Sequence, residues 1–192
     1  MNYTWNWHVI WEYKGVLLKG TFITIELTLL VVLIGTILGI LLGISCLVKN
    51  KIIRNPLLFF IDIIRALPVL IFLIWVYYFL PVLVGKNITA FWCAVVALSI
   101  NLSVFIADVV RGAIEGVPKG QVEAARALGM NYVLRMRHII LPEAIRQLVP
   151  TFTMLYITML KFSTLASVIA VYELLHSAEG IISNTYKTLE IY

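Results

Sequence analysis

Long runs of residues without a charged side chain are the feature that most limits what this chain can fold into. The first run extends from Leu27 to Val48, and its 22 residues would form a helix of roughly 33 Å, long enough to cross a bilayer core. Three comparable runs follow at 66–85, 87–107 and 147–172, and only the last of these contains a charge, Lys161. Backbone polar groups must be paired within lipid, so such runs are expected to be helical. The sequence therefore predicts an all-α, polytopic membrane helix bundle with four visible spans.

The composition is that of an integral membrane protein of one domain. Of the 192 residues, 61% are hydrophobic and 13% are charged, about half the charged share of roughly 25% typical of soluble domains. The net charge of +5 is therefore interpreted by its location and not as a nucleic-acid-binding surface. The two cysteines, Cys46 and Cys93, lie in apolar runs without metal-ligand spacing, so we expect inert thiols and no metal site.

Basic residues are distributed unequally between the two ends of the predicted spans. Short loops rich in Lys and Arg stay in the cytoplasm, which places the N-terminus outside. The nine basic residues expected inside are Lys49, Lys51, Arg54, Arg111, Lys119, Arg126, Arg135, Arg137 and Arg146. The four expected outside are Lys14, Lys19, Lys86 and Lys187.

Three glycines recur at four-residue spacing in the first run. Gly35, Gly39 and Gly43 lie on one stripe of the predicted helix, where another helix backbone can approach closely. The stripe is either a packing face or an ordinary feature of a glycine-rich membrane helix. Both interpretations are open from the sequence.

The segments that flank the first run contain their own signals. Residues 1–19 carry several tryptophans and are expected to lie at the membrane surface. After the run, a basic turn at residues 49–56 is expected to close at an Asn-Pro pair. Asp62 and Arg65 share one helical face and are expected to form a structural ion pair, and Pro68 is expected to kink the next helix or to mark its start.

A polar and basic island separates the last two runs. It extends from Pro118 to Pro142 and predicts two short amphipathic helices. Pro118 suits the first position of a helix, and Gly129 can end that helix in the left-handed conformation. Asn131 is a candidate cap for the second helix, which Pro142 is expected to interrupt.

The island resembles the signature loop of the membrane subunits of ATP-binding-cassette importers. The seven matching residues are Glu123, Ala124, Ala125, Gly129, Ile139, Leu141 and Pro142. In that family the loop carries the coupling helix, which lies in a groove of a separate cytoplasmic ATPase. The resemblance implies that Glu123 and Arg126 contact the ATPase, that Gly129 supplies the turn, and that Ala124 and Ala125 permit close docking. It implies a type I importer permease fold with this cytoplasmic loop inside one transmembrane domain.

Two other segments are similar to importers of polar amino acids. Residues 97–129 follow that group with few departures, and residues 64–70 follow it except at Ala66 and Leu67. The resemblance implies a multi-pass protein of the plasma (inner) membrane of a prokaryote. It implies four kinds of partner: cytoplasmic ATPase subunits, an identical or related permease subunit, an extracytoplasmic amino-acid-binding protein and membrane lipid.

The energy source is expected in another polypeptide. The chain has no Gly-x-x-x-x-Gly-Lys-Ser/Thr phosphate loop, so ATP with magnesium would bind the partner ATPase, and no cofactor is expected in this chain.

Lys161 is the one charge inside the fourth run, where it costs on the order of 3 kcal/mol unless it pairs or meets water. Residues 160–169 resemble a segment of the same importers, but Phe162 stands where an aspartate is usual. We hypothesise that Lys161 shapes the solute passage or its gate. The alternative is a structural role as a partner of Asp108 or of a group of carbonyls.

Polar residues also occur in the third run. Ser99 and Ser103 are serines of the kind that bond to their own helix backbone, and this is expected of at least one of them. Asn101 is a candidate for lining a water-filled passage, because a buried amide needs partners. The candidate translocation residues are Asn101, Ser103, Asp108 and Lys161.

Members of this family usually continue with one more spanning helix. This chain shows four spans, and the fifth is expected to be missing at the C-terminus. The leading hypothesis is a permease subunit of an importer for a polar amino acid. The alternatives are an importer of another small solute and an ion-coupled secondary carrier, while a membrane enzyme is disfavoured because His8, His138 and His176 are dispersed.

Overall fold

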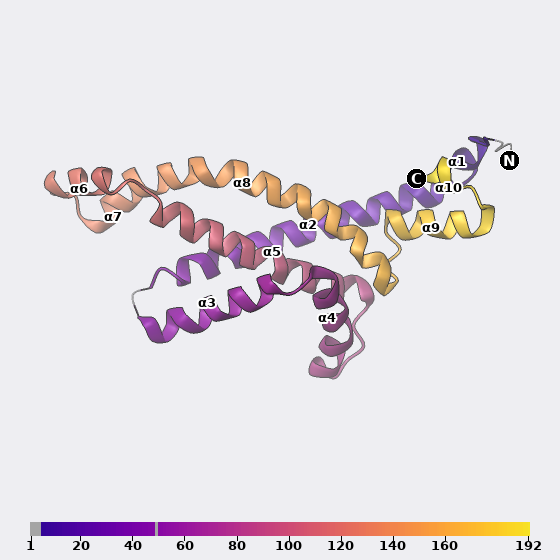
Figure 1. Cartoon of the computed structure of the whole chain (residues 1–192), viewed down its shortest axis with the longest axis horizontal. Helices are drawn as coiled ribbons and strands as arrows, with labels where there is room; N and C mark the ends of the chain where they lie inside the picture. The colour runs from indigo at the N-terminus through magenta and orange to yellow at the C-terminus, as the bar shows by residue number, and fades with distance from the viewer. Residues whose placement is uncertain (1–4, 49) are drawn as a thin grey trace. The chain divides into compact units, whose positions relative to one another are not determined.

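The computed structural model describes residues 5–48 and 50–192, and the elements in this part of the chain are helical. The helices are α1 (His8–Glu12), α2 (Lys14–Ser45), α3 (Lys51–Ala66), α4 (Val69–Val84), α5 (Ala90–Glu115), α6 (Lys119–Ala127), α7 (Tyr132–Arg135), η1 (Met136–Ile140), α8 (Leu141–Phe162), η2 (Ser163–Ile169), α9 (Leu174–Thr185) and α10 (Thr188–Ile191) (Figure 1). The chain divides into two compact units. The first unit comprises Met1–Val31, Leu70–Leu98 and Met159–Tyr192, and the second comprises Val32–Val69 and Ser99–Thr158.

Helices long and apolar enough to cross a membrane coincide with three of the four predicted runs, whereas the run at 66–85 forms only the 16-residue helix α4. Within the described residues, Lys14–Ser45, Ala90–Glu115 and Tyr132–Ile169 each meet this test, and α3 and α4 make a fourth span if the broken pair is taken together. The break lies at Leu67 and Pro68, where Leu67 is extended and α4 starts at Val69. The prediction that Pro68 marks the start of a helix is thus confirmed.

Helix α2 begins well before the predicted first span. Its first residue is Lys14, so residues 14–19 belong to the same helix as the first span and do not form a separate element. The predicted location of residues 1–19 at the membrane surface stays a prediction, and residues 1–4 lie outside the described residues. Thr21 and Thr24 donate hydrogen bonds to the carbonyls of Leu17 and Gly20, one turn earlier, at 2.8 and 3.0 Å. These threonines satisfy their hydroxyls within the helix, and no helix breaker separates Lys14 from the apolar run.

The glycine stripe of α2 is a packing face against α5 in the second unit. A Cβ at Gly35 would lie 2.9 Å from Leu102 Cδ2, and one at Gly43 would lie 2.8 Å from the Ala107 carbonyl oxygen. Only glycine permits this approach, since real Cβ atoms do not come so close to a neighbouring side chain or backbone. Of the two interpretations of the stripe, the structure selects the packing face.

Helix α3 includes the residues predicted to form a basic turn. The Asn50 side chain accepts a hydrogen bond from the Ile52 N–H at 2.9 Å and caps the helix, so Lys51 and Arg54 lie in its first turns. Pro56 lies inside α3, and the predicted closure of the turn at Asn55 and Pro56 is wrong. The predicted turn also included Lys49, which lies outside the described residues.

The C-terminal segment of the first unit packs on the start of α2. A Cβ at Gly20 would lie 2.7 Å from Ser177 Oγ, and the Leu174 N–H donates to Thr24 Oγ1 at 3.1 Å. These contacts fix α9 along α2 (Figure 1). The Asn6 N–H donates to Glu190 at 2.9 Å, which joins the N-terminal segment to α10.

Candidate functional site

The polar island folds into a helical hairpin that turns at Gly129 (Figure 1). Pro118 precedes the first residue of α6 as its N-cap, one position earlier than predicted. Gly129 has a φ of 77°, in the left-handed region. The Gly129 N–H donates to the Arg126 carbonyl at 2.9 Å, and the Met130 N–H donates to the Ala125 carbonyl at 3.1 Å. This pair of bonds closes the helix in a Schellman motif, so the predicted turn at Gly129 is confirmed.

The second half of the hairpin continues into α8. The Asn131 side chain accepts a hydrogen bond from the Leu134 N–H at 2.9 Å, which confirms the predicted cap. The prediction that Pro142 interrupts this helix is wrong, because α7, the π-helical segment Met136–Ile140 and α8 follow one another without a break. The wider π turn, with Leu141 N–H bonded to the Met136 carbonyl, accommodates a proline that has no N–H and whose ring would clash with an α-helical carbonyl.

Most residues of the signature lie on the surface of this hairpin. Ala125 is buried and Ile139 is half-buried. The exposed signature residues are Glu123, Ala124, Gly129, Leu141 and Pro142, and Arg126 next to them is also exposed. Glu123 and Arg126 also line a small hollow of about 290 Å³ at the junction of α5 and α6. The hairpin thus presents charged side chains next to the small side chain of Ala124, which allows another chain to approach closely.

The hairpin also exposes apolar side chains that the sequence did not identify as part of the site. Leu128 is 81% exposed, and Tyr132 and Val133 are exposed beside it at the turn. Leu128 follows Val122 and Ala125 at helical spacing, but the turn at Gly129 leaves Leu128 uncovered. The only sequence signal for the exposure of Leu128 is its position directly before Gly129, the glycine predicted to be left-handed. We call Leu128, Tyr132 and Val133 the apolar tip.

Asp108 lies in a chain of ion pairs between α3 and α5 of the second unit. Asp108 accepts from Arg65 at 2.9 Å and from Arg111 at 2.7 Å, and Arg111 also donates to Glu115 at 3.0 Å. Arg54 completes the series at 4.0 Å from Glu115. We call these five residues the charge chain. The predicted pair of Asp62 with Arg65 is wrong, because the Arg65 guanidinium reaches the neighbouring helix instead.

The polar residues at the centre of α5 are buried. Ser103 donates to the Ile100 carbonyl at 2.8 Å, so the expectation that one serine bonds to its own helix is confirmed. Asn101 is 1% exposed, and its Oδ1 has no hydrogen-bond partner among the described residues; the same holds for Ser99 Oγ. An unpaired amide oxygen at this depth is a strong acceptor for a water or a solute group that reaches it.

Lys161 lines a cavity of about 710 Å³ in the first unit. The other polar side chains at this cavity are Thr21, Thr24, Thr164, Glu173 and Tyr192, and the rest of its lining is apolar. Glu173 is fully buried and accepts from the N–H groups of Leu175 and His176, both at 2.8 Å, so it caps α9. In the described part of the chain no carboxylate lies within ion-pair distance of Lys161. The candidate translocation residues therefore fall into two groups, with Lys161 in the first unit and the other three in the second.

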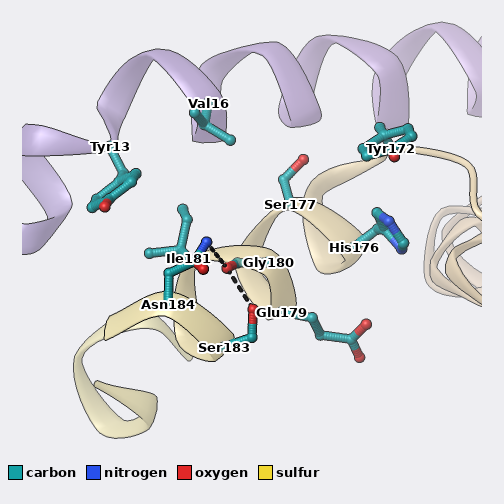
Figure 2. Close-up of a pocket in the computed structure, with 10 residues that line it drawn as sticks. All are labelled: Tyr13, Val16, Tyr172, His176, Ser177, Glu179, Gly180, Ile181, Ser183 and Asn184. Atoms are coloured by element: carbon teal, nitrogen blue, oxygen red, sulfur yellow. Dashed lines mark hydrogen bonds between the residues drawn. The ribbon is translucent and has the colours of Figure 1, made fainter. Parts of the chain in front are cut away.

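A further hollow of about 440 Å³ lies beside α9 in the first unit (Figure 2). Ser183 and Asn184 both donate to the Gly180 carbonyl at 2.9 Å, while Ser177 points toward α2 and Glu179 points away from it (Figure 2). The His176 and Tyr172 rings pack edge to face, with their centroids 4.7 Å apart. The side chains of Ser183 and Asn184 are thus engaged within α9, and the residues described contain no group of three metal-ligating side chains.

An all-α chain with membrane-length helices and an exposed two-helix loop has the architecture of the membrane subunit of a transport system. The chain matches the family model described as binding-protein-dependent transport system inner membrane component over residues 35–188. It belongs to this family, and it is a transporter membrane subunit and not an enzyme.

Relatives and solved structures agree with this assignment. An octopine transport system permease protein of Rhizobium meliloti is 34% identical over 191 residues, which cover 95% of this chain and 78% of that protein. A glutamine transport system permease protein of Escherichia coli (strain K12) is 32% identical over 188 residues, which cover 97% of this chain and 86% of that protein. The crystal structure of an amino acid ABC transporter with histidines matches with a TM-score of 0.91 at 35% identity, covering 99% of this chain and 88% of that one.

Proposed function

We propose that this chain is the permease subunit of an ATP-driven importer for a polar amino acid. The observation that carries the proposal is the hairpin around Gly129, which exposes Glu123, Arg126 and the apolar tip together. Relatives named for glutamine, arginine and octopine transport favour a polar amino acid as the solute.

The hairpin is the surface on which a cytoplasmic ATPase subunit would dock. Glu123 and Arg126 supply charged contacts, Ala124 and the buried Ala125 keep the helix slim, and Gly129 fixes the turn. Ile139, Leu141 and Pro142 join the hairpin to α8 and give it a fixed direction. ATP and magnesium would bind in the ATPase. Closure of two ATPase subunits would bring two such hairpins together and tip the spans from an inward-facing to an outward-facing state.

The orientation follows from the charges of the hairpin and α3. The chain would lie in the inner membrane of a prokaryote. With these basic segments in the cytoplasm, its N-terminus would lie on the outer side. An identical or related permease chain would complete the passage, and an extracytoplasmic binding protein would deliver the solute to the outer side.

Lys161 is the strongest candidate in this chain for a residue that lines the solute passage. Its ammonium lies at a largely apolar cavity and has no carboxylate partner among the described residues, so it is free to meet a solute carboxylate or water. Asn101 is the second candidate, because its Oδ1 is unpaired. Ser103 and Asp108 are weaker candidates, since each already has a bonding partner within the second unit.

The proposal is tested by purifying the chain from its own membranes and identifying the proteins that accompany it by mass spectrometry. We expect a phosphate-loop ATPase in about equal amount to the permease, and its loss in the variants Glu123→Arg and Gly129→Val. Valine at a φ of 77° is strained by about 1–2 kcal/mol, so the turn would not form correctly.

The matched control is Gly15→Ala in α2, outside the hairpin. A Cβ at Gly15 meets nothing within 4 Å and needs no unusual backbone conformation, so this variant should retain the ATPase. Uptake of radiolabelled glutamine, arginine and a non-amino-acid solute into vesicles then distinguishes the solute classes. Absence of any ATPase from gently solubilised protein, or full retention by Gly129→Val, would refute the proposed docking surface.

A further inference from the structure

The charge chain connects α3 to the last turns of α5 at two levels. Arg65, in the last turn of α3, meets Asp108, and Arg54, near the start of α3, meets Glu115, the last residue of α5. Asp108, Arg111 and Glu115 follow at spacings of three and four and so share one face of α5. The two helices therefore run antiparallel here (Figure 1), and the two links are separated by about 10 Å along α5.

The links depend on one another because the charges alternate. Asp108 is shared by Arg65 and Arg111, and Glu115 is shared by Arg111 and Arg54. The five side chains are between about a quarter and a half exposed, and an isolated exposed pair would contribute little. Movement of α3 away from α5 would nevertheless break both links together, because it would separate Arg54 and Arg65 from their carboxylate partners. We therefore expect α3 and the inner end of α5 to move as one body.

The charge chain ends where the hairpin begins. Glu115 lines the small hollow at the start of the loop together with Lys119, Glu123 and Arg126 of α6. Buried Val117 lies in the short connection between α5 and α6. A displacement of α6 thus reaches Glu115 through a connection of three residues and reaches α3 through Arg54 and Arg65.

We propose that the charge chain carries the movement of the hairpin to α3, with Arg54 and Arg65 as positioning residues for transport. The inference rests on the proposed function, because it assumes that an ATPase moves the hairpin. The contiguous ion pairs supply the physical link between the loop and a helix that is distant from it in sequence.

The test uses the complete transporter, reconstituted in proteoliposomes with its ATPase. The variant Arg54→Gln/Arg65→Gln removes both links from α3 and leaves the pairs within α5 intact. The variant should assemble and hydrolyse ATP, but the amount of solute transported per ATP should fall about tenfold. Arg65→Lys, which keeps a positive charge beside Asp108, should retain most of the coupling.

The matched control is Lys51→Gln. Lys51 is an exposed basic residue on the same helix, and it forms no ion pair within the described residues. The control should transport as much solute per ATP as the unmodified complex. This comparison separates the loss of a link from the loss of a positive charge on α3.

Three results would overturn the inference. The first is a normal ratio of transport to ATP hydrolysis in the double variant, with or without a lower melting temperature. The second is an equal loss of coupling in Lys51→Gln. The third is failure of the double variant and of both single Gln variants to assemble, which would show that the charge chain serves assembly. Failure of the proposed function is a separate result, since the unmodified complex would then show no ATP-dependent uptake.

Discussion

Gly39 of α2 lies against Ile106 of α5 so closely that a Cβ at position 39 would be 2.6 Å from the Ile106 Cβ. The Ser103 carbonyl oxygen would be 2.8 Å from the same atom. Because the obstacle includes backbone, a small shift of one side chain cannot relieve it.

Gly39→Ala should destabilise the permease by about 1–3 kcal/mol, because the two helices must separate to admit the methyl group. Thermal unfolding of the purified chain in detergent measures the loss. Gly15→Ala is the control on the same helix, since a Cβ at Gly15 meets nothing within 4 Å, and it should be neutral or slightly stabilising. Equal melting temperatures for the two variants would contradict the packing described.

Leu128→Asn should weaken binding of the ATPase about tenfold without lowering the stability of the isolated permease. Leu128 is 81% exposed, so its replacement removes no internal contact but reduces the apolar tip. Binding of the purified ATPase to permease in nanodiscs measures the effect. Leu128→Met, which keeps an apolar side chain of similar size, should bind normally. A lower melting temperature with unchanged binding would show that Leu128 has an internal role instead.

Lys161→Met should reduce transport about tenfold while leaving the stability of the permease unchanged or higher. An apolar side chain suits a largely apolar cavity, whereas a charge in a membrane protein carries a cost of on the order of 3 kcal/mol. Uptake into proteoliposomes and thermal unfolding are measured on the same preparation. Lys86→Met, at an exposed position, is the control and should transport normally. Retained transport in Lys161→Met would remove this residue from the passage.

Glu173 should make folding stability depend on pH. Burial raises the pKa of its carboxyl group, although the hydrogen bonds from the Leu175 and His176 N–H groups oppose this effect. A folded-state pKa above the unfolded value means that the folded chain binds the proton more tightly. The contribution of this residue is therefore complete below the unfolded pKa and is lost as the pH rises through the folded pKa.

The measurement is the melting temperature of the chain from pH 4 to pH 8. Relative to Glu173→Gln, the unmodified chain should lose stability as the pH rises above the ordinary range of a glutamate. Glu12→Gln, which removes an exposed carboxylate of α1, should keep the pH dependence of the unmodified chain. A Glu173→Gln variant with the same pH dependence as the unmodified chain would rule out the buried carboxyl as its source.

Features that depend on local spacing could be predicted from the sequence. The turn at Gly129 and the cap at Asn131 are confirmed, because both are set by residues within one helical turn. The stripe that includes Gly39 indicated a possible packing face, but the sequence could not identify α5 as the partner. The spans were predicted because the length of an apolar run is itself the physical requirement for crossing a bilayer.

Features that depend on partners distant in sequence could not be predicted from the sequence. Asp62 lies three residues from Arg65 and was the natural partner by spacing, whereas Asp108 is 43 residues away and is brought close only by the packing of α3 on α5. Helical periodicity likewise assigns Leu128 to a face but does not say what covers that face. The helix continues through Pro142 because a π turn precedes it, and no simple residue pattern predicts a π turn.

The π-helical segment Met136–Ile140 has a mechanical consequence. Because it joins α7 to α8 without a break, residues 132–158 of the second unit form a continuous helical lever of about 40 Å, and the hairpin lies at one end of this lever. A tilt of about 10° at the hairpin would displace the other end of such a lever by about 7 Å, which is more than one helical turn. If the proposed docking of an ATPase rotates the hairpin modestly, the opposite end of this lever would therefore move by a much larger distance.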